Sequence, residues 1–153
     1  MAIIGIEKLY NNNTENVEAF YKKHQQNPNN NGVRIIDEIM SIRTDDNTTK
    51  LIPGKVLSVR MNGNERTFFV SLKGGMNIYL GISTKVLTDL GYQSISNGGL
   101  VPSKKIAIYK DGDIEYKSII SIEEINTSLM HYEIRIKNTD NYLLDRGIIV
   151  KAD

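Results

Sequence analysis

The stretch HYEIRIKNTDNYLLDRGIIVKAD, residues 131 to 153, contains the most informative pattern in this chain. Residues 132–137, 142–144 and 147–150 each read as a short strand of β-branched, aromatic and aliphatic residues. Polar residues and glycine, which favour turns, separate these runs. Short strands broken at close intervals by turn residues are typical of an all-β sandwich or barrel, so we expect a mostly β fold.

The same pattern extends toward the N-terminus as far as Gly32. Further strands are expected at residues 34–43, 55–61, 66–72, 77–80, 93–96, 105–109 and 115–123. The breaks between them contain Pro53-Gly54, Asn62-Gly63, Gly74-Gly75, Asn97-Gly98-Gly99 and Asp111-Gly112-Asp113. Asn-Gly and Asp-Gly supply the positive φ angles of tight hairpins. Residues 84–90 are open to a second interpretation as a helical turn.

Residues 1–31 have a different character. Apolar and aromatic residues fall at the i, i+3, i+4, i+7 spacing of one helical face, at Val17, Phe20, Tyr21 and His24. A short amphipathic helix over about residues 15–26 follows, ending before Pro28, because proline disfavours helix in the preceding residue. We therefore predict two parts, an N-terminal arm over residues 1–31 and a β domain over residues 32–153.

The arm is too apolar to be a free tail. We expect it to dock on the main domain or on a neighbouring subunit. The residues predicted to make these contacts are Ile3, Ile4, Ile6, Val17, Phe20 and Tyr21.

Composition excludes several classes of function. The formal net charge is +1, so no global field attracts nucleic acid or an anionic membrane. The chain has no cysteine, which excludes disulfides, thiolate metal sites and a cysteine nucleophile. No basic and apolar leader and no long apolar run is visible, so we expect a protein of the cytoplasm of the producing cell or of a virion.

Three segments, in order, resemble hedgehog/intein (Hint) domains. They are residues 41–58, residues 77–96 and residues 131–153. The last is the most specific, because Tyr-Glu-Ile-Arg-Ile, Asn-Tyr and Gly-Ile-Ile-Val occur in the family's order. The resemblance covers about residues 34–153 and implies a Hint-like β fold, a pseudo-symmetric horseshoe of short strands.

The resemblance also implies positions for the family's chemistry. A Cys, Ser or Thr at the domain's first position attacks its preceding carbonyl, while a Thr-x-x-His pair polarises that amide and protonates the leaving nitrogen. A further histidine and a terminal His-Asn pair then cut the chain at the other end. These positions fall on Ile35, on Ile82 and Lys85, on Asp140, and on Lys151 and Ala152.

None of these residues matches the family pattern. Isoleucine has no nucleophilic atom, a lysine ammonium is a poor proton shuttle at neutral pH, and alanine cannot cyclise. We therefore expect an inactive domain that is not an enzyme.

The remaining polar candidates have simpler interpretations. His131 is interpreted as a surface histidine at a strand start rather than as a general base, because no Ser, Cys or second His accompanies it. His24 is interpreted as half-buried core rather than as a ligand. Asp111, Asp113 and Glu115 fit a hairpin better than a calcium loop. No metal and no cofactor is expected.

These observations favour a structural or scaffolding protein built on an inactive Hint domain. We expect it to be a phage virion component, such as a tail, baseplate or capsid accessory subunit, whose partners are other protein subunits in a homo- or hetero-oligomeric assembly. Two alternatives remain open. One is a self-processing Hint domain with a non-standard nucleophile such as Ser41 or Thr44, and the other is a toxin-associated binding module.

Overall fold

The computed structural model describes the whole chain except residues 1, 12–13, 27–37 and 46–47. Strands dominate the described part, and one helix, α1 (Val17–Gln26), lies against them. The strands are β1 (Ile3–Ile4), β2 (Glu38–Asp45), β3 (Thr48–Glu65), β4 (Thr67–Leu72), β5 (Asn77–Gly81), β6 (Val86–Thr88), β7 (Gly91–Gln93), β8 (Lys105–Lys110), β9 (Asp113–Glu124), β10 (Leu129–Ile136), β11 (Asn141–Leu143) and β12 (Ile149–Lys151). The expectations of a mostly β fold and of one short helix are confirmed.

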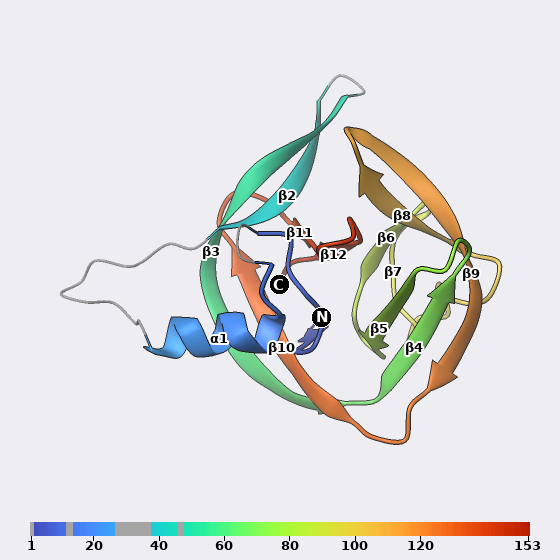
Figure 1. Cartoon of the computed structure of the whole chain (residues 1–153), viewed down its shortest axis with the longest axis horizontal. Helices are drawn as coiled ribbons and strands as arrows, with labels where there is room; N and C mark the ends of the chain where they lie inside the picture. The colour runs from blue at the N-terminus through green and yellow to red at the C-terminus, as the bar shows by residue number, and fades with distance from the viewer. Residues whose placement is uncertain (1, 12–13, 27–37, 46–47) are drawn as a thin grey trace.

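The strands form two antiparallel sheets. One has the order β1-β10-β3-β2, and the other has the order β11-β12-β6-β8-β9-β4-β5 with β7 paired to β6. The long strands curl around a common centre in Figure 1, and both chain ends lie near that centre. Sequence-distant strands are therefore neighbours, as in β10, which lies between β1 and β3.

The strand β3 is longer than the sequence predicts. It runs through both Pro53-Gly54 and Asn62-Gly63, where we expected breaks. Gly63 has a φ of 110° and faces His131, where the β3 to β10 register shifts. The glycine thus forms a bulge rather than a hairpin turn. The alternative of a helical turn at residues 84–90 is wrong, because β6 occupies residues 86–88 and pairs with β7, which follows at residue 91.

The opening segment belongs to the core. Ile3 pairs with Tyr132 and Ile4 with His131, and both isoleucine side chains are fully buried. Leu9, Val17 and Phe20 are fully buried in the same cluster, because β1 packs on β10 and α1 packs on β10 and β3. The predicted boundary at residue 31 lies outside the described residues.

This packing changes the predicted interaction set. Ile3, Ile4, Val17 and Phe20 are buried within their own chain, so they present no surface to a neighbour. Tyr21 is partly buried, with its ring 5.0 Å from that of Tyr132. Ile6, at 48% exposure, is the member of the set whose side chain points most to solvent. No helix in the described ranges is long and apolar enough to cross a membrane.

Candidate functional site

Both ends of the chain meet on strand β10. Ile3 pairs with Tyr132 near the middle of β10, and the backbone N–H of Asp153 donates to the Ile134 carbonyl at 3.0 Å, two residues farther along. The marks for the two termini accordingly lie close together in Figure 1. The first and last described residues are thus held side by side by one strand.

A buried hydrogen bond fixes the first described carbonyl. The Thr84 hydroxyl donates to the Ala2 carbonyl oxygen, with 2.5 Å between Oγ1 and O. Both residues are fully buried. Thr84 lies in the short turn that connects β5 to β6, and its backbone N–H donates to the Gly81 carbonyl. A hydroxyl is therefore aimed at one particular peptide bond, the one that joins Ala2 to Ile3.

The His131 imidazole adjoins this hydrogen bond. Its ring is fully buried, and Nδ1 lies 2.7 Å from the Leu129 carbonyl oxygen. Because a carbonyl only accepts, the network assigns the proton to Nδ1 and leaves a lone pair on Nε2. Nε2 has no hydrogen-bond partner within the described part of the chain. The interpretation of His131 as a surface residue is wrong, because β1 covers this part of β10.

The electrostatics keep this ring neutral. Burial lowers the pKa of His131, while the hydrogen bond to Leu129 and the negative charge of Glu65 offset only part of that effect. A neutral imidazole with a free Nε2 lone pair can accept a proton at neutral pH. Burial thus keeps the Nε2 lone pair of His131 unprotonated.

Gly81 makes room for the imidazole. A Cβ atom on Gly81 would overlap His131 Nε2, would lie 2.6 Å from Cδ2, and would lie 3.1 Å from Thr84 Oγ1. The imidazole nitrogen and the threonine hydroxyl therefore border the same small space. Glycine is the residue that leaves this space open at the end of β5.

A carboxylate completes the polar cluster. Ser83 Oγ donates to Glu65 Oε1 at 2.5 Å, and Glu65 lies opposite Leu129 in the β3 to β10 register. Ser83 is half-buried and next to Thr84 in the chain. We refer to Gly81, Thr84 and His131, together with the Ala2 carbonyl, as the opening site.

The opening site lies one residue before the pair that the resemblance implied. The structure brings Gly81 and Thr84 to the chain start, whereas the prediction named Ile82 and Lys85. The Ile82 backbone N–H donates to the Arg66 carbonyl, and the Lys85 carbonyl accepts from Lys151. Ile35, the predicted first position, lies outside the described residues. The sequence analysis did not recognise that Gly81 leaves room for the His131 imidazole. The one signal for it in the sequence is a glycine three residues before Thr84.

The other three predicted positions gather at the C-terminal end. Lys151 Nζ lies 4.0 Å from Asp140 Oδ2 and 5.2 Å above the ring of Tyr92. The Ala152 N–H donates to the Asp140 carbonyl at 2.8 Å. Burial, and then the charge of Asp140, raises the pKa of Tyr92, so this phenol stays protonated. An ion pair and a methyl group thus stand where the resemblance places two imidazoles and an asparagine.

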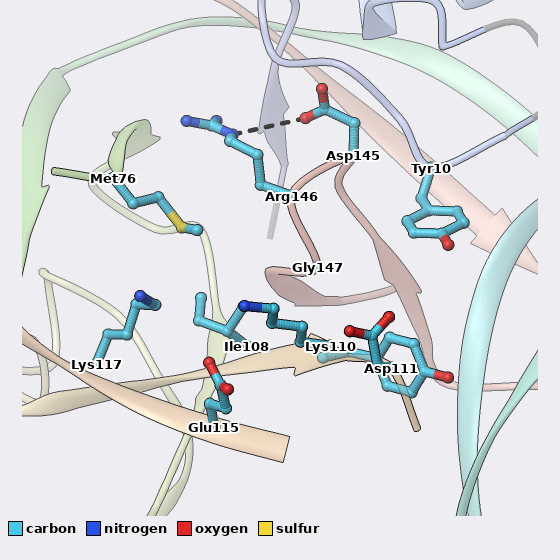
Figure 2. A pocket seen from close by; sticks show the side chains of 11 residues that line it. Tyr10, Met76, Ile108, Lys110, Asp111, Glu115, Lys117, Asp145, Arg146 and Gly147 are labelled. Atoms are coloured by element: carbon cyan, nitrogen blue, oxygen red, sulfur yellow. Dashed lines mark ion pairs between the residues drawn. The ribbon is translucent and has the colours of Figure 1, made fainter. Parts of the chain in front are cut away.

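A cavity of about 380 Å³ lies apart from the opening site. Figure 2 shows Lys110, Glu115 and Lys117 on one side of it, and Asp145 and Arg146 on the other. The side chains that line it have mixed charge, and Arg146 is engaged, with NH2 2.6 Å from Glu7 Oε2. Among the described residues no group of three or more His, Cys, Asp or Glu side chains could hold a metal ion.

Comparison with known proteins identifies the fold. No protein-family model and no curated protein matches this sequence. Solved structures do match, among them a DnaB intein from Synechocystis sp. PCC 6803, with a TM-score of 0.76, 21% identity, and coverage of 99% of this chain and 98% of that chain. The gp41-1 intein matches with a TM-score of 0.67, 15% identity and the same coverage, and the TvoVMA intein with 0.72, 15%, and 97% and 95%.

These matches define a class. The chain has the Hint fold of inteins, as its C-terminal sequence predicts. The likeness covers nearly the whole chain, so it includes the segment that we had set apart as an arm. The expectation that the protein is not an enzyme is wrong, because its structural neighbours are inteins, which are self-splicing domains.

The fit between Gly81 and His131 can be tested by a double-mutant cycle. We expect Gly81→Ala to lower the free energy of unfolding by about 1–3 kcal/mol, because the added methyl group overlaps the imidazole. In a His131→Ala background the methyl group has space, so the same substitution should cost much less. Urea unfolding measures both values, and an equal cost in the two backgrounds would contradict the described packing.

Proposed function

We propose that this chain is a self-processing Hint domain that breaks the peptide bond between Ala2 and Ile3, once per molecule. The fold that it shares with inteins supports a reaction at the chain's own boundary. The observation that supports this bond as the cleavage site is the hydrogen bond from the Thr84 hydroxyl to the Ala2 carbonyl, beside the imidazole of His131.

The opening site offers the groups that peptide cleavage requires. The Thr84 hydroxyl polarises the Ala2 carbonyl, and such a donor is strongest in a site that excludes water. His131 supplies a neutral imidazole that can take a proton from a nucleophile and return it to the departing Ile3 nitrogen. Threonine and histidine are also the residue types of the family's Thr-x-x-His pair. Here the histidine comes from β10, and Gly81 leaves the room that it occupies.

We propose that the C-terminal end does not react. Ala152 has no side-chain group that could cyclise, and Lys151 faces Asp140 in an ion pair rather than acting as a proton shuttle. Ala2 likewise offers no nucleophile that could receive a second chain. The expected outcome is cleavage at the N-terminal side without ligation of the flanking segments.

A fusion with one reporter domain before residue 1 and another after residue 153 tests this proposal. We expect the upstream reporter to be released during incubation at neutral pH and the downstream reporter to stay attached. His131→Gln should slow release by about 10²- to 10⁴-fold, the usual contribution of a general acid–base group. His24→Gln, at the chain's other histidine, is the matched control and should cleave at the unchanged rate. Intact mass spectrometry of the products reads out the site.

Two results would count against the proposal. One is an uncleaved fusion after prolonged incubation over the range from mildly acidic to mildly alkaline pH. The other is release that proceeds equally fast in His131→Gln, since the reaction would then not use the opening site.

A role in a larger assembly is our second proposal, and it concerns where the domain acts. Ala152 has a methyl group where the resemblance places a reactive asparagine, which favours a C-terminal end kept for its contacts rather than for chemistry. We propose that such contacts join it to protein subunits of a phage particle, such as the tail, the baseplate or the capsid. The chain should then co-sediment with purified particles in a sucrose gradient. Its recovery only in the fractions of free protein would exclude this location.

A further inference from the structure

We infer that Thr84 is the nucleophile of the opening site and forms an ester with the acyl group of Ala2. This inference rests on the proposed self-cleavage and names the atom that performs it. A nucleophile must come from elsewhere because Ala2 has none of its own. The nearest hydroxyl is the one that already contacts the Ala2 carbonyl.

The distance favours attack by this hydroxyl. Thr84 Oγ1 lies 2.5 Å from the Ala2 carbonyl oxygen, and the carbonyl carbon is one bond of about 1.23 Å beyond that oxygen. Oγ1 can therefore be no farther than roughly 3.7 Å from the carbon, close to the 3–3.5 Å of a reactive conformer.

The required base is in place. A threonine hydroxyl becomes a useful nucleophile only when an adjacent group takes its proton. His131 Nε2 has a free lone pair and borders the same space at Gly81 as Thr84 Oγ1. When the Thr84 hydroxyl hydrogen rotates from the Ala2 carbonyl oxygen toward His131 Nε2, Oγ1 stops donating to the carbonyl and becomes able to attack it.

Burial favours Thr84 over its competitors. Ala2, Thr84 and His131 are all fully buried, so bulk water does not reach the carbonyl. The neighbouring Ser83 is half-buried, and its hydroxyl donates to the Glu65 carboxylate instead. Of water, Ser83 and Thr84, only Thr84 has a hydroxyl that contacts the Ala2 carbonyl and also borders the space next to His131 Nε2.

The reaction balances without any further reagent. The Thr84 hydroxyl proton passes to His131 Nε2 as Oγ1 bonds to the Ala2 carbonyl carbon. The bond from that carbon to the Ile3 nitrogen then breaks, and the nitrogen takes the proton from the imidazolium. The product is an ester of Thr84 with the segment that ends at Ala2, together with a free Ile3 amine. Departure of the Ile3 amine opens the site to water, which then hydrolyses the ester, leaves the Ala2 carboxylate and restores the Thr84 hydroxyl.

Substitutions at Thr84 in the two-reporter fusion test this role. Thr84→Val keeps the shape without the hydroxyl and should lower the release rate at least about 100-fold, whereas Thr84→Ser should retain release. Thr84→Cys should form a thioester instead of an ester, so dithiothreitol should accelerate release of the upstream reporter. Hydroxylamine should capture that reporter as a hydroxamate from the unmodified fusion. Near-UV circular dichroism checks that each variant is folded.

The outcomes separate this inference from the proposed function. If the unmodified fusion cleaves while folded Thr84→Val cleaves at a similar rate, Thr84 is neither the nucleophile nor the polarising donor, and self-cleavage stands without both roles. If Thr84→Cys releases the upstream reporter at the same rate with and without dithiothreitol, Thr84 does not form a covalent intermediate with Ala2. If the unmodified fusion never cleaves, and neither thiol nor hydroxylamine releases the reporter from Thr84→Cys, then both the proposed function and the inference fail.

Discussion

The pairing of β1 with β10 is the interaction on which the opening site depends. It buries Ile3 and Ile4 against Tyr132 and His131, which fixes the Ala2 carbonyl at the Thr84 hydroxyl and covers the imidazole. Without β1, strand β10 would be an open edge with unpaired backbone groups, and His131 would be exposed to water. The same strand receives Asp153, so one element brings both chain ends together.

The position of His131 distinguishes this chain from a Hint domain that has merely lost its catalytic residues. Read along the sequence, the Thr-x-x-His pattern is absent, and the placement of its two positions on Ile82 and Lys85 suggests inactivity. In space, His131 fills the volume that Gly81 leaves free and borders the Thr84 hydroxyl. A glycine and a histidine from different strands thus place an imidazole beside a threonine again. Burial supports this arrangement by keeping the ring neutral.

The sequence predicts the fold better than the site. The alternation in residues 132–137 and the turn residues before and after it depend on local spacing, and so does the helical face from Val17 to His24. The burial of Ile3, Ile4 and His131 depends instead on a pairing between opposite ends of the chain, which no local pattern encodes. A slip of one residue separated Ile82 and Lys85 from Gly81 and Thr84, and in a turn such a slip changes which side chain faces the core.

The opening site requires His131 to be a buried, neutral base with its proton on Nδ1. An NMR titration of the chain with isotope-labelled histidine measures this directly, because ring nitrogen shifts report both the tautomer and the pKa. We expect the Nδ1–H tautomer and a pKa below the ordinary histidine value of about 6.5, since burial disfavours the charged ring. A pKa at or above that value, or a proton on Nε2, would show that His131 cannot act as the base of the opening site.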